Sequence, residues 1–76
     1  MTLQQLKYIL TIVDCGSISE AAKQLFISQP GLSNAVKEIE EELGIEIFLR
    51  SSKGIALTNE GIEFLSSARQ VVEQAE

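Results

Sequence analysis

The chain has 76 residues, a length that fits one small domain with a single core. Hydrophobic residues make up 45% of it, enough to fold without disulfides, and the lone cysteine, Cys15, rules out a disulfide within the chain. No run approaches the roughly 18 apolar residues of a membrane span. The opening MTLQQLKY lacks the basic and apolar regions of a signal peptide. We therefore expect a soluble, cytoplasmic protein.

The formal net charge of −5 argues against nucleic-acid binding until its distribution along the chain is considered. Residues 1–37 carry three lysines against two acids, and residues 47–59 carry two basic residues and no acid. Nine of the eleven acidic residues lie in two blocks, with five glutamates in 38–46 and four in 60–76. DNA binding depends on the local field more than on total charge, so the composition permits it and predicts weak nonspecific affinity.

Capping patterns and apolar spacing predict two helices in the first part of the chain. Thr2 and Gln5 form a capping-box pattern ahead of apolar residues spaced three and four apart, which indicates a helix over about 3–15. Ser17 is a second N-cap candidate, and the apolar residues after it predict a short helix that ends near Phe26.

A third helix is predicted over 29–43, after a turn of about three residues, as in helix-turn-helix units. Ser28 is its N-cap candidate, and Pro30 fits the first turn, where a missing N–H costs little. Gly44 suits the position after its C-terminus. Four apolar residues fall within about 60° on a helical wheel and are expected to face the core: Leu32, Val36, Ile39 and Leu43.

Two short β-prone runs, 45–50 and 55–58, flank a turn sequence at 51–54, which predicts a hairpin. Thr58 then caps a final helix that runs towards Glu76. The expected fold is mainly α. A winged helix-turn-helix of three helices and a two-stranded wing occupies residues 1–58, and a long linker and dimerisation helix occupies 59–76.

The first half of the third helix carries polar groups suited to base edges. Pro30, Asn34 and Lys37 lie opposite the apolar stripe, Ser33 lies on its flank, and Gln29 opens the helix. Asparagine and glutamine can pair with adenine in the major groove, and serine and lysine reach bases or phosphates. The second half is acidic, so we expect the helix to enter the groove by its N-terminal end. Lys37 has an equally good alternative role as an i,i+4 partner of a glutamate.

Arg50 and Lys53 make the hairpin a candidate for phosphate contacts on the flanking backbone, since such contacts position a protein without reading sequence.

The last helix has two apolar edges, of which one can pack on the first helix and the other on a second copy; the alternative is a helix that only covers the core. The candidate dimerisation residues are Phe64, Leu65, Ala68, Val71, Val72 and Ala75.

Four stretches together resemble the N-terminal DNA-binding domain of LysR-type transcriptional regulators. They are SISEAAKQLFISQPGLS at 17–33, the opening LQQLKYILTIVDCGSISEAAKQL, ELGIEIFLRSS, and LTNEG before the last helix. The resemblance covers essentially the whole chain. It implies a winged helix-turn-helix, pairing of two subunits through the linker helix, and binding to dyad-symmetric promoter sites, usually under the control of a small metabolite.

The resemblance also assigns roles to residues. It implies that Gln29, Pro30, Ser33 and Asn34 face the groove, that Arg50 holds a phosphate, and that Lys53 and Gly54 form the wing tip. With Ser28 at the helix opening, the candidate DNA-binding residues are Ser28, Gln29, Pro30, Ser33, Asn34, Lys37, Arg50 and Lys53.

Three features depart from the family pattern. Gly31 stands where alanine is common, Asn34 stands where a longer side chain is common, and the wing is less basic than usual. The metabolite-sensing domain that normally follows the linker helix is absent from these 76 residues, so we expect a fragment of a longer regulator, in which only the absent domain binds an inducer.

Two other classes of function compete. The sequence pI of about 4.6 favours a winged-helix module that binds protein, although its recognition face is then expected to be apolar. An enzyme built on Glu40, Glu41 and Glu42 is disfavoured, because consecutive helical residues point in different directions and the chain has no histidine. We expect no cofactor and no metal. Cys15 could act as a redox sensor, but a small buried thiol is the usual case.

Overall fold

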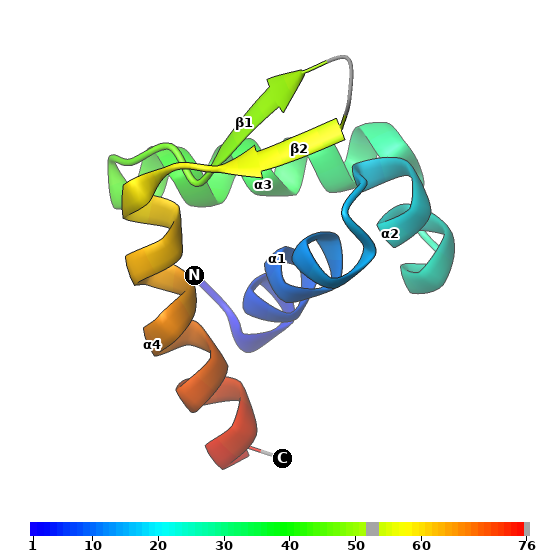
Figure 1. Ribbon diagram of the computed structural model, residues 1–76. Coiled ribbons are helices and arrows are strands. Elements are labelled where there is room, and N and C mark those ends of the chain that lie inside the picture. Colours follow the sequence, from blue (N-terminus) through cyan, green and yellow to red (C-terminus); the bar gives the residue numbers. More distant parts are fainter. Residues whose placement is uncertain (52–53, 76) are drawn as a thin grey trace.

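The computed structural model describes residues 1–51 and 54–75 of the chain. Its elements follow one another in the predicted order (Figure 1), and they are α1 (Leu3–Cys15), α2 (Ile18–Leu25), α3 (Gln29–Leu43), β1 (Phe48–Ser51), β2 (Gly54–Leu57) and α4 (Asn59–Ala75). The structure confirms the mainly α winged helix-turn-helix with a long last helix. No helix in these two ranges is long and apolar enough to cross a membrane.

Side-chain caps fix the starts of the first three helices. The Thr2 hydroxyl accepts the Gln5 backbone N–H at 3.1 Å, and the Gln5 side chain accepts the Thr2 N–H in return, so the predicted capping box is present. Ser17 caps α2, and Ser28 caps α3 by accepting the Gly31 N–H at 3.0 Å. These caps explain why local sequence alone placed the helix boundaries correctly.

The core lies between α1, α2 and α3 and is closed by α4 on one side (Figure 1). Three of the four residues in the apolar stripe of α3 are buried, but Leu43 is 36% exposed, so the expectation that it faces the core was wrong. The reason is its position along the axis. Leu43 belongs to the last turn, beside the exposed C-cap Gly44, where α3 ends in solvent.

The wing is a two-stranded antiparallel hairpin whose strands pair from Phe48↔Leu57 to Ser51↔Gly54. Ile47, just before β1, is fully buried, and Phe48 is 6% exposed, so the base of the hairpin belongs to the core. The hairpin then extends beside α3 (Figure 1). The wing and the helix of the predicted recognition face therefore lie on the same side of the molecule.

Candidate nucleic-acid interface

The N-terminal half of α3 presents a polar face to solvent. Gln29, Pro30, Asn34 and Lys37 are exposed and Ser33 is half-buried, whereas Leu32, Val36 and Ile39 on the opposite face are buried. The structure therefore brings together on one accessible face every candidate residue of this helix. Their roles in binding remain predictions.

The hydroxyl group of Ser28 can cap α3 and still donate a hydrogen bond. It is exposed, and its Oγ accepts the Gly31 N–H, so the hydroxyl proton remains able to donate to an anion. Pro30, in the first turn of α3, has no N–H group. The other N–H groups of this turn and the positive end of the helix dipole lie at the start of α3.

A hollow of about 210 Å³ lies where α2, α3 and the wing meet. Two predicted residues, Gln29 and Ser33, line it from α3, and Gly54 and Ile55 line it from β2. Ser17 and Ser19, at the start of α2, complete it beside Ile18. Sequence reasoning treated Ser17 only as a helix cap and did not select Ser19. The adjacent hydroxyl residues were the available signal, but their approach to α3 depends on tertiary packing.

The acidic second half of α3 divides into two groups. Glu38, Glu41 and Glu42 are exposed. Glu40 is half-buried, and its Oε2 accepts two backbone N–H groups, from Ile47 at 2.7 Å and from Phe48 at 3.2 Å. The carboxylate of Glu40 is therefore bound to the backbone at the start of the wing, a role that the sequence did not reveal.

Lys37 forms no ion pair with any residue in the described ranges, so the alternative role as the i,i+4 partner of Glu41 is not seen. Lys37 is exposed on the same side of α3 as Asn34.

In the wing, Arg50 pairs with Ile55 through the strand backbone. Its side chain, like the whole of Lys53, lies outside the described residues.

The candidate dimerisation residues differ in their burial within this chain. Leu65, Ala68 and Val72 are at most 9% exposed and belong to the core of this chain, because this edge of α4 packs against α1. Phe64 is half-buried against the same core. Val71 is 49% exposed and remains available, while the side chain of Ala75 lies outside the described residues. The second exposed apolar residue of α4 is Ile62, at 56%, which was not selected.

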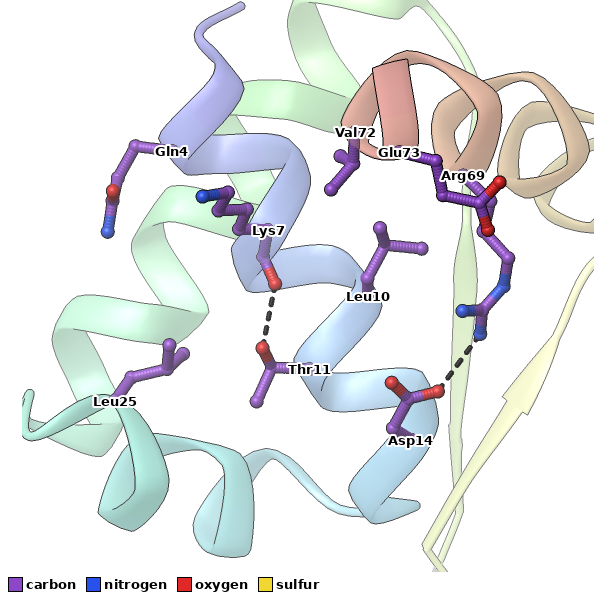
Figure 2. A pocket seen from close by; sticks show the side chains of 9 residues that line it. All are labelled: Gln4, Lys7, Leu10, Thr11, Asp14, Leu25, Arg69, Val72 and Glu73. Atoms are coloured by element: carbon purple, nitrogen blue, oxygen red, sulfur yellow. Dashed lines mark hydrogen bonds and ion pairs between the residues drawn. The ribbon is translucent and has the colours of Figure 1, made fainter. Parts of the chain in front are cut away.

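An ion pair fastens α4 to α1 beside this edge. Arg69 of α4 lies 2.9 Å from the Asp14 carboxylate of α1, and Figure 2 shows the pair at the rim of an open groove of about 370 Å³. Leu10 and Val72 line the groove between the two helices. The edge of α4 with Leu65, Ala68 and Val72 faces inward, and Ile62 and Val71 are exposed on opposite flanks of it.

Comparison with known proteins agrees with this geometry. The family model described as bacterial regulatory helix-turn-helix protein, lysR family, matches residues 3–62. The HTH-type transcriptional regulator TcbR of Pseudomonas sp. (strain P51) is 39% identical over 75 residues, which are 99% of this chain and 26% of that protein.

Two crystal structures of DNA complexes are also similar. The CbnR DBD–DNA complex matches with a TM-score of 0.93 and 39% identity over 99% of this chain and 86% of that one. The BenM DBD/catB site 1 DNA complex matches with a TM-score of 0.93 and 36% identity over 99% of this chain and 84% of that one. The chain spans about a quarter of the length of the full regulators that it resembles.

Proposed function

Because this chain belongs to the lysR family of bacterial regulatory helix-turn-helix proteins, we propose that it binds double-stranded DNA sequence-specifically and regulates transcription. In this proposal α3 lies in the major groove, and the wing, at about 50–55, contacts the flanking backbone. The two similar DNA complexes support this reading.

The observation that carries the proposal is the exposed polar face of α3. Gln29 and Asn34 supply amides that can pair with adenine, and Ser33 supplies a hydroxyl at the edge of the hollow shared with α2 and the wing. A helix that binds a protein groove needs apolar anchors instead. The polarity of this face therefore favours DNA over the alternative of a protein-binding module.

The charges of α3 set the orientation of the helix in the groove. Its opening has the positive end of the dipole and Lys37 lies further along, whereas Glu38, Glu41 and Glu42 are exposed towards its C-terminal end. Phosphates attract the first part and are repelled by the second. The helix is thus expected to enter the groove by its N-terminal half.

We propose that two copies pair through α4 and read a dyad-symmetric promoter site. Val71, which is exposed, and Phe64, which is half-buried, lie on one flank of α4 and supply apolar surface that the monomer leaves partly uncovered. Two recognition helices on one face of a duplex lie about one turn, ~34 Å, or a multiple apart. The proposed location of the protein is the cytoplasm, because bacterial promoters lie there. A small-molecule inducer would bind to a part of a longer regulator that these 76 residues do not include. No enzymatic step is needed for this function.

The test is selection of bound duplexes from a randomised pool at two salt concentrations, with a sizing run on the same sample. We expect a two-fold symmetric motif from the wild-type chain. Asn34→Ala should relax the motif at one position in each half-site, whereas Ser66→Ala, an exposed change on α4, should leave it unchanged. A protein that sizes as a dimer but selects no motif at low salt would contradict the proposal and favour the protein-binding module.

A further inference from the structure

A single carboxylate of α3 holds the start of the wing. Glu40 Oε2 accepts the Ile47 N–H at 2.7 Å and the Phe48 N–H at 3.2 Å. Both donors precede or open β1, and both residues are buried, Ile47 completely and Phe48 to 6% exposure. Buried N–H groups need an acceptor, and bonds to an ionised group are about twice as strong as neutral ones.

The carbonyl of Ile47 is fixed as well. It accepts the backbone N–H of Thr58 at 3.1 Å, and Thr58 immediately precedes α4. The amide side of Ile47 is thus bound to α3 and the carbonyl side to the residue that opens α4. The wing therefore leaves the core at a point where its backbone is bound to α3.

We propose that Glu40 is a positioning residue for DNA binding, which sets the wing at a fixed distance and angle from α3. A site read by both elements requires the base contacts of α3 and the backbone contacts of the wing to form together. A wing that can shift relative to α3 loses its phosphate contact while α3 still reads the bases. This inference rests on the proposed function and adds a role for a side chain that does not face the DNA.

Glu41 provides a matched control. It carries the same charge and adjoins Glu40 in the same helix, but it is exposed, and its side chain forms no hydrogen bond or ion pair among the described residues. The substitutions Glu40→Gln and Glu41→Gln therefore change the protein net charge equally. Each variant is compared on the full and the trimmed duplex, which separates the general repulsion by an exposed carboxylate from the effect of the contacts with Ile47 and Phe48.

The experiment measures binding of the whole chain to its selected duplex and to the same duplex trimmed of the flanking phosphates, over a range of salt. For the wild type and for Glu41→Gln, trimming should lower the slope of log K against log salt by about one per wing. For Glu40→Ala, trimming should leave the slope unchanged, because the wing contact is already lost. Glu40→Gln, which keeps a neutral acceptor, should be intermediate.

A change of one base pair in the half-site should cost all four proteins the same factor in affinity, because α3 itself is unaltered. Amide exchange of Ile47 and Phe48 in the free protein should be faster in both Glu40 variants than in Glu41→Gln. If exchange is faster but trimming changes the slope as much as in the wild type, Glu40 is only structural and the inference is overturned.

If Glu40→Ala does not fold, Glu40→Gln decides: a trimming effect equal to that of Glu41→Gln overturns the inference. Failure of the proposed function appears elsewhere, in the wild type. A wild-type chain that binds no duplex, or that is indifferent to the flanks, refutes the wing contact before any variant is compared.

Discussion

Among the five glycines, Gly61 is the one at which an added Cβ would approach backbone atoms most closely, and it makes a sharp prediction for Gly61→Ala. A Cβ at this position would lie 2.4 Å from the carbonyl oxygen of Ile47 and 3.1 Å from its C and Cα atoms. The obstacle is main chain, so no side-chain rotation relieves it. The Ile47 carbonyl is also held by Thr58, whose N–H donates to it at 3.1 Å, and the start of α4 must move instead.

Three terms give the magnitude. Overpacking of this kind costs about 1–3 kcal/mol. Displacement of α4 weakens its cap, in which Thr58 Oγ1 accepts the Gly61 N–H at 2.8 Å, and such a cap is worth about 1 kcal/mol. The higher helix propensity of alanine returns about 1 kcal/mol. We expect a net loss of about 2 kcal/mol, which for a domain of this size lowers Tm by roughly 8–16 °C.

The assay is thermal unfolding followed by circular dichroism at one protein concentration, with Gly31→Ala as the matched control. A Cβ at Gly31 would lie 2.9 Å from Ser28 Oγ, a side-chain atom that can turn away, although it then no longer caps α3. The lost cap costs about 1 kcal/mol. The higher helix propensity of alanine returns about 1 kcal/mol, so stability should change by no more than about 1 kcal/mol in that variant. If Gly61→Ala unfolds at or above the wild-type temperature, the close approach to Ile47 does not exist in solution and the reasoning is refuted.

Four further outcomes are expected. Lys37→Ala should weaken binding to all duplexes and lower the salt slope by about one; an unchanged slope removes this residue from the interface. Val71→Glu should give a folded chain that sediments as a monomer, whereas Leu65→Glu, which places a charge in the core, should unfold by circular dichroism. Ser17→Ala should cost about 1 kcal/mol in urea unfolding, since it removes the α2 cap. Phe26→Asn should gain roughly 1 kcal/mol in the same assay, because Phe26 has φ 58° and is 93% exposed.

The parts of the fold that could be predicted are those fixed by neighbouring residues. Thr2 with Gln5, Ser17 and Ser28 place three helix starts within a few residues of sequence, and Gly44 places an end in the left-handed conformation at φ 71°. The polar face of α3 was predictable for the same reason, since the angle between residues on a helix is fixed by its period.

The parts that could not be predicted depend on where one element stops against another. A helical wheel gives the direction of Leu43 but not its place beyond the packed length of α3. It shows two apolar edges on α4 but not that Leu65 and Val72 meet α1 while Val71 is left exposed. Ser19 reaches the hollow beside α3 only through the packing of α2. These properties depend on how the elements pack against one another, which the residue pattern does not contain.

Glu40 shows why the acidic block of α3 is compatible with DNA binding. Its carboxylate is bound to the backbone N–H groups of Ile47 and Phe48, so it stabilises the base of the wing instead of facing a phosphate. The exposed carboxylates of Glu38 and Glu41 then act on a duplex that approaches along the whole helix and repel it. Only an approach by the N-terminal half of α3 avoids them. A net charge of −5 thus weakens nonspecific binding to DNA in general. The approach by the N-terminal half of α3 is the orientation in which the duplex is repelled least.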